Sequence, residues 1–191
     1  MTSTRRVRGG RGGVAIMALA ATLIAAPGIS AGTGADVAPD VAVKAAFLFN
    51  FAKFVEWPAL TAGAPLLVCI VGNDRIASAF IETVRGQNIS GHPLEAHRSQ
   101  ESVTWRVCHV LFIADAEAQR SAGRLDGIKT LPVLTVSDHK GFARGGGIIE
   151  LYVEGGRMRF AINLDAADRS GLHLSSRLLG LAKVIRNSHV Q

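Results

Sequence analysis

The sequence predicts an α/β fold, a doubly wound and mostly parallel sheet flanked by helices. Three short runs are continuously apolar and rich in branched side chains, residues 66–71, 107–113 and 131–136, as is typical of strands buried on both faces. Segments 74–85 and 116–128 lie between these runs and carry helical patterns. Strands that alternate with helices in this way indicate a doubly wound sheet.

Upstream of these strands, the segment 44–58 and the residues just before it predict a helix with two apolar rows. One row starts at Val41 and the other holds three phenylalanines. We expect Pro58 to end the helix, because proline lacks the amide donor and pushes Trp57 out of helical geometry. A surface helix needs only one apolar row, so this helix is either enclosed in the domain or packed against a second chain.

Downstream of the strands, two apolar segments at 148–153 and 158–163 flank the glycines Gly155 and Gly156. Both central residues of a type I′ turn need positive φ, so consecutive glycines between strand-like segments indicate an antiparallel hairpin. We expect this hairpin to close one edge of the sheet.

Two helical segments are expected after the hairpin. Asp165 is the predicted N-cap of the first and Ser175 of the second, because short polar side chains accept hydrogen bonds from the free amides of a helix start. Leu178, Leu181 and Ile185 form one apolar stripe on the second helix, which should therefore pack on the core.

The N-terminus predicts export. Four arginines among the first eleven residues precede an apolar run at 14–26, and small residues follow at 28–35. This is the pattern of a secretory signal peptide, residues 1–31, with cleavage between 31 and 35. Arg5 and Arg6 leave the twin-arginine route open as an alternative. We expect a disordered segment at 32–40 and one domain at 41–187.

Neither charge nor length supports nucleic-acid binding or membrane insertion of the mature protein. Loss of the four leader arginines lowers Lys plus Arg from 21 to 17 against 15 Asp plus Glu, so the net charge falls from +6 to +2. A nearly neutral domain lacks the electrostatic basis for binding nucleic acid. The leader's apolar run is shorter than the ~20 residues that a helix needs to span a bilayer.

Two segments of the chain resemble the YfiR family, KAAFLFNFAKFVEWP at 44–58 and FAINLDAADRSGLHLSSRLLGLAKVIR at 160–186, with a glycine-rich stretch at 141–147 between them. The resemblance runs from about residue 41 to 186. It implies a periplasmic protein that inhibits an inner-membrane diguanylate cyclase by binding its periplasmic sensor region, and thereby lowers cyclic-di-GMP. It also implies no catalysis and no cofactor.

The partner contact is expected on apolar surface that the first helix or the last helix leaves exposed. For the first helix the candidates are aromatic side chains, which dominate interface energies: Phe47, Phe51, Phe54 and Trp57. The same surface could serve a homodimer, and a fully buried core helix is the competing interpretation.

A second hypothesis starts from a basic cluster, Arg169, His173 and Arg177. Placed near a helix N-terminus, these side chains could bind a phosphate or carboxylate. The protein would then be a periplasmic anion-binding module that feeds another membrane sensor. A solvated basic face is the simpler interpretation.

Cys69 and Cys108 lie inside two of the strand-like runs. In an oxidising compartment two cysteines most simply form one disulfide, although two buried free thiols remain an alternative. Closing this loop should stabilise the fold by about 4 kcal/mol in the chain-entropy model. Some members of the family that the chain resembles carry a second cysteine pair between Gly141 and Leu151, and this sequence has none there.

Catalytic and metal-binding arrangements are not indicated. Ser137, Asp138 and His139 are consecutive, so they cannot converge on one reacting atom as a triad does. His92 and His97 have no third ligand at a spacing that suits a metal.

Nucleotide binding also lacks its motif. Asn73 follows a strand and precedes a helix, but G-x-G-x-x-G is absent, so the predicted fold is Rossmann-like without the nucleotide-binding fingerprint. Open α/β sheets bind ligands at the carboxyl ends of their strands, which leaves Asn73 and Asp115 as candidates for a small-molecule pocket.

Overall fold

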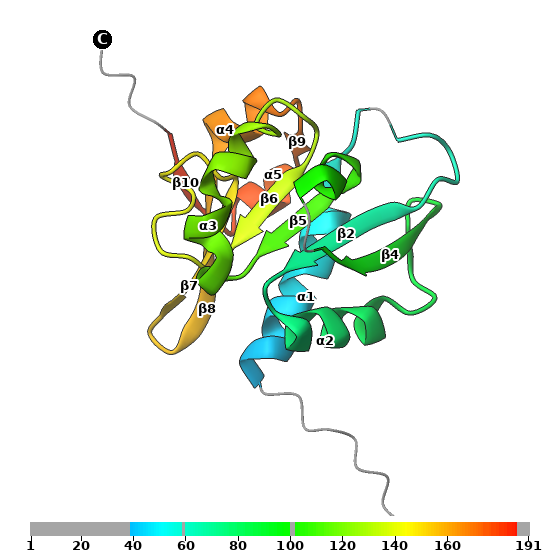
Figure 1. Ribbon diagram of the computed structural model, residues 1–191, viewed down its shortest axis with the longest axis horizontal. Coiled ribbons are helices and arrows are strands. Elements are labelled where there is room, and N and C mark those ends of the chain that lie inside the picture. The colour runs from blue at the N-terminus through cyan, green and yellow to red at the C-terminus, as the bar shows by residue number, and fades with distance from the viewer. Residues whose placement is uncertain (1–38, 59, 100–101, 187–191) are drawn as a thin grey trace, which may run out of the picture. The chain divides into compact units, whose positions relative to one another are not determined.

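The computed structural model has the predicted α/β architecture, with helices on both faces of a mostly parallel sheet (Figure 1). The structure describes residues 39–58, 60–99 and 102–186, all within one unit, Ala35–Gln191. The predicted signal peptide and its cleavage region lie outside these residues.

The elements in chain order are α1 Pro39–Lys53, β1 Val55–Glu56, β2 Leu66–Val71, α2 Asp74–Val84, β3 Asn88–Ile89, β4 His92–Arg98, the 3₁₀ helix η1 Ser102–Val107, β5 Val110–Ile113, α3 Asp115–Asp126, β6 Leu134–Ser137, β7 Ile149–Glu154, β8 Arg157–Asn163, α4 Leu164–Arg169, β9 His173–Leu174, α5 Ser176–Leu179 and β10 Lys183–Ile185.

Within the described residues, the main sheet has eight strands in the order β10-β8-β7-β6-β5-β2-β4-β3. Side chains of β2 alternate between two hydrophobic clusters: Val68 and Ile70 join the cluster with α1 and α2, whereas Cys69 and Val71 join the cluster with α3. Successive side chains of a strand point to opposite faces. Burial on both faces therefore explains why this strand reads as a continuous apolar run.

Helix α1 ends earlier than the sequence predicts, at Lys53 and not at Pro58. The next residues leave the helix because β1 pairs antiparallel with β9, with Val55 opposite Leu174. The helix row that starts at Val41 is buried along its whole length. The second row, with the phenylalanines, is only partly covered, so α1 is enclosed on one side and accessible on the other.

The predicted hairpin is β7–β8, an antiparallel pair whose turn glycines have positive φ, 58° at Gly155 and 74° at Gly156. It lies one strand inside the sheet, because β10 adds to β8 in parallel (Figure 1).

β10 replaces most of the predicted final helix. Helix α5 covers only Ser176–Leu179, and Gly180 is its C-cap. Leu181 is 69% exposed and Ile185 is in the strand, so the predicted apolar stripe is wrong beyond Leu178. The strand satisfies backbone groups along the edge of β8, which a continued helix would leave unpaired.

One of the two predicted helix caps is confirmed and the other is wrong. Asn163, not Asp165, caps α4, and its side chain accepts a hydrogen bond from Ala166 N at 3.0 Å. Asp165 lies in the first turn because α4 begins earlier than expected. Ser175 caps α5 as predicted and accepts from Leu178 N at 3.3 Å.

A second hairpin, β3–β4, was not predicted. Its turn holds Ser90 and Gly91, with φ of 54° and 86°, and a Ser-Gly dipeptide is a known turn signal. β4 has largely exposed side chains, so it lacks the apolar run that marks the central strands.

The glycine-rich loop between β6 and β7 is fixed by one carboxylate. Glu150 accepts hydrogen bonds from Gly141 N at 3.1 Å and from Ala143 N at 3.2 Å. Asn163 Nδ2 donates to Ala143 O at 2.6 Å. These contacts hold the loop against β7 and β8 where the sequence has no second cysteine pair.

Candidate partner-binding site

A surface groove of about 270 Å³ lies between α1 and the segment that contains α5. Its lining combines phenylalanines with one cation and one exposed leucine: Phe47, Phe51, Phe54, Phe160, Arg177 and Leu181. Both segments that resemble the YfiR family therefore contribute to this groove.

The floor of the groove is a cluster of three aromatic rings. The ring centroids of Phe51 and Phe160 are 5.1 Å apart, and Phe47 lies 5.7 Å from each. Phe51 is only 1% exposed, so in this chain it belongs to the core and supports the groove from below. Phe47 is half-buried and is the accessible ring of the three.

The wall and rim of the groove combine apolar surface with positive charge. The guanidinium of Arg177 lies over the ring of the half-buried Phe54 at 6.0 Å, a cation–π distance. Leu181 is 69% exposed at the rim. The groove therefore suits an apolar side chain that has a negative charge nearby.

Backbone pairing between two distant segments positions the groove. Ser175 N donates to Phe54 O at 3.0 Å, directly beside the β1–β9 pair. Ser175 then caps the start of α5. From this helix Arg177 lies against Phe54, and Leu178 points into the core, where its side chain is 3% exposed.

Phe160 and Leu181 are among the groove residues that sequence reasoning missed. The sequence indicates Phe160 only as a strand residue. The spacing of Leu178, Leu181 and Ile185 predicts that Leu181 belongs to the apolar stripe of a helix. The glycine before Leu181 is the available signal, because glycine commonly ends a helix and exposes the residue after it.

Trp57 lies outside the groove. Its ring makes an edge-on contact with His109, with centroids 5.7 Å apart. The indole Nε1 is buried and has no hydrogen-bond partner among the described residues. Trp57 is therefore not among the residues that line the groove with Phe47, Phe51 and Phe54.

The predicted basic cluster is dispersed over three elements. Arg169 ends α4, His173 lies opposite Glu56 in the β1–β9 pair, and Arg177 lies in the groove. All three side chains are exposed. Of the three, only Arg177 lines the groove.

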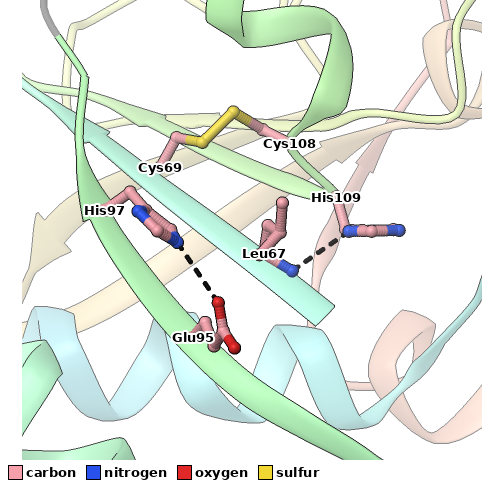
Figure 2. Close-up of a disulfide and its surroundings, with 6 residues drawn as sticks. All are labelled: Leu67, Cys69, Glu95, His97, Cys108 and His109. Atoms are coloured by element: carbon pink, nitrogen blue, oxygen red, sulfur yellow. Dashed lines mark hydrogen bonds and ion pairs between the residues drawn. A yellow bond between two sulfur atoms is a disulfide. The ribbon is translucent and has the colours of Figure 1, made fainter. Parts of the chain in front are cut away.

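The structure contains the disulfide predicted between Cys69 and Cys108, with a Cα–Cα distance of 5.9 Å (Figure 2). It joins β2 to the residue that follows η1 and lies in the smaller hydrophobic cluster. His97 is the register partner of Cys69 on β4, and its Nε2 is 3.4 Å from Glu95 Oε2.

His109, the residue after Cys108, contacts the backbone near the start of β2. Its Nδ1 accepts a hydrogen bond from Leu67 N at 3.0 Å (Figure 2), so the neutral ring carries its proton on Nε2. Burial lowers the pKa of His109 below its usual value, and the nearby His92 lowers this pKa further. The fold therefore favours the neutral ring.

The candidate side chains at the carboxyl ends of the strands make contacts within the protein. Asn73 caps α2 and accepts from Ile76 N at 3.0 Å. Asp115 Oδ1 lies 2.6 Å from His139 Nδ1, and Asp138 pairs with Lys44 at 2.6 Å. These side chains bridge α1, α3 and the end of β6, which is a structural arrangement.

Ser137 does not form a triad with its neighbours. It is fully buried, and its Oγ accepts from His139 N at 3.0 Å. No cluster of three or more metal-ligating side chains is present among residues 39–58, 60–99 and 102–186. Over the same residues, none of the helices has the length and apolar character that crossing a membrane requires.

Comparison with known proteins gives a family match over nearly the whole described chain. A family model described as YfiR/HmsC-like matches residues 41–183. Among solved structures, the chain resembles a conserved domain protein from Vibrio cholerae O1 biovar El Tor, at 13% identity and a TM-score of 0.46. That match covers 75% of this chain and 59% of the Vibrio protein.

Proposed function

The chain belongs to the YfiR/HmsC-like family, and from that premise we propose that it is an exported periplasmic protein that inhibits an inner-membrane diguanylate cyclase. The family is regulatory and periplasmic in character. The protein binds the periplasmic sensor region of the cyclase and lowers the output of cyclic-di-GMP. This requires only a higher affinity for the inactive state of the cyclase, without catalysis.

The groove between α1 and α5 is the observation that best supports a protein partner. It offers an accessible aromatic ring at Phe47, an exposed apolar rim at Leu181 and a cation at Arg177. Aromatic and arginine side chains are the residue types that carry most binding energy at protein interfaces. Phe51 supports this surface from the core and does not contact the partner.

The test measures cellular cyclic-di-GMP with the gene deleted, restored, and restored without its leader. We expect deletion to raise the level and only the exported form to lower it again. Equal levels in all three strains, with the protein detected in the periplasm, would refute the proposal.

The anion-binding alternative has weaker support. Arg169, His173 and Arg177 would have to converge on one ligand, but they are exposed on three separate elements. Calorimetric titration with phosphate and acetate distinguishes the two functions, because the regulator proposed here requires neither anion.

A further inference from the structure

One edge of the main sheet is open beside the groove. β10 is the last strand on that side in the described residues, and it pairs only with β8. An edge strand presents unpaired N–H and C=O groups on its outer side. The segment that carries Leu181 leads directly into this strand.

The register identifies which residue offers those groups. Asn163 N donates to Ile148 O in the direction of β7, so the preceding residue, Ile162, directs its backbone groups toward β10. Val184 is the register partner of Ile162. In a parallel ladder the two neighbours of Val184 then bond to Ile162, and the N–H and C=O of Val184 itself point to the open edge.

The chemistry around this edge is apolar and basic. Val184 is 45% exposed, and Leu181 nearby is 69% exposed. Lys183, Arg177 and Arg186 are exposed cations. Arg186 is 3.7 Å from Asp165, whereas Lys183 has no ion pair within the described residues.

We propose that β10 accepts an extended acidic segment of the regulated membrane protein as a further strand of the sheet. This inference rests on the function proposed above. Backbone hydrogen bonds to an added strand supply affinity, and its alternating side chains supply specificity. The side chains of the segment alternate between the two faces of the sheet: an apolar side chain lies against Leu181 and Val184, and a carboxylate on the other face lies against Lys183.

The charge of the edge selects an acidic segment over a second copy of this chain. Pairing of β10 with itself would place Lys183 and Arg186 from both copies along one seam, and like charges across an interface are unfavourable. A charged edge strand also resists unspecific pairing. An acidic strand removes this repulsion.

The decisive variant is Val184→Pro. Proline removes only the N–H that points outward, and it is tolerated on edge strands where that group faces solvent. We expect the melting temperature and periplasmic level of the protein to stay unchanged. Val184→Thr is the matched control, because it keeps the N–H and a branched side chain.

The readout is cellular cyclic-di-GMP in the deletion strain complemented with each variant. We expect full repression by wild type and Val184→Thr, and a return to the deletion level with Val184→Pro. Full repression by a folded Val184→Pro would overturn strand addition. Should Val184→Pro not fold, Lys183→Glu decides: it keeps every backbone group, and we expect it to lose repression.

Two further outcomes separate the possible failures. Full repression by Lys183→Glu would overturn the acidic nature of the added strand. A wild-type dimer that becomes monomeric in Val184→Pro, with repression intact, would assign the edge to a second copy and overturn the proposal. If wild type itself does not lower cyclic-di-GMP, the proposed function fails and this inference fails with it.

Discussion

The two faces of the sheet are stabilised in different ways. The α1 face is covered by α1 and α2 and contains the larger hydrophobic cluster, with large buried side chains such as Leu48, Phe80 and Phe112. The α3 face contains a smaller cluster around Trp105 and the disulfide. A small apolar cluster contributes less burial energy, and a cross-link compensates by restricting the unfolded chain.

The candidate binding groove and the disulfide therefore lie on different faces of the sheet. The larger cluster ends in the groove, where α5 is too short to cover Phe47 and the chain continues as an edge strand. The disulfide lies on the opposite face of the sheet. We therefore expect changes in the disulfide to affect the free energy of unfolding more than partner binding.

The largest expected effect comes from matched leucines on the two faces. Leu134 faces the larger cluster and Leu111 the smaller one, and both are fully buried. We expect Leu134→Ala to lower the free energy of unfolding by about 4 kcal/mol and Leu111→Ala by about 3 kcal/mol, because a thinner layer collapses more easily around a cavity. Urea denaturation measures both, and a larger loss at Leu111 would reverse the comparison.

Removal of the disulfide should cost somewhat less. The bond joins residues 39 positions apart, and we expect the double variant Cys69→Ala with Cys108→Ala to lose about 2–4 kcal/mol. Wild type under reducing conditions is the control and should show a similar loss. A variant that remains folded but no longer lowers cyclic-di-GMP would show that the two faces are coupled.

Acid should weaken the fold through His109. Its folded-state pKa is lowered, so folding favours the neutral ring, and this stabilisation is complete above the unfolded-state value of about 6.5. It is lost as the pH falls through the folded-state pKa, because a protonated Nδ1 cannot accept from Leu67 N.

Urea denaturation at neutral and mildly acidic pH measures this loss. In His109→Asn the side-chain oxygen can accept the same hydrogen bond but does not titrate, so this variant should lose less stability on acidification than wild type. An equal loss in both proteins would assign the acid sensitivity to other groups.

The smallest change in stability is expected at the rim of the groove. Leu181 is 69% exposed, so Leu181→Glu should change the free energy of unfolding by no more than about 0.5 kcal/mol. The new glutamate would lie beside the acidic partner segment and repel it, so we expect the variant to lose repression of the cyclase. Val107→Glu is the control, since Val107 is 62% exposed at the end of η1, and repression there should persist.

The central strands could be predicted because burial on both faces leaves an unmistakable pattern. β2 matches the predicted residues 66–71, and the hairpin follows from Gly155 and Gly156. The edges could not be predicted as well. β4 is mostly exposed, and β10 follows Gly180 in a sequence whose spacing also fits a helix.

The aromatic residues that line the groove could be anticipated by residue type but not by arrangement. The sequence marks α1 as a helix with two apolar rows, yet it does not say which ring a distant strand covers. Phe160 on β8 covers Phe51 and leaves Phe47 half-buried. Such coverage depends on pairing between segments more than one hundred residues apart, as between Val55 and Leu174, which local spacing does not encode.

The β1–β9 pair also makes the groove depend on the complete domain. The groove needs α1 from the first part of the domain and Arg177 and Leu181 from its last part, and contacts of long sequence separation form late in folding. A chain truncated before α5 therefore has no groove to offer. Under the function proposed above, such a clipped molecule should not lower cyclic-di-GMP.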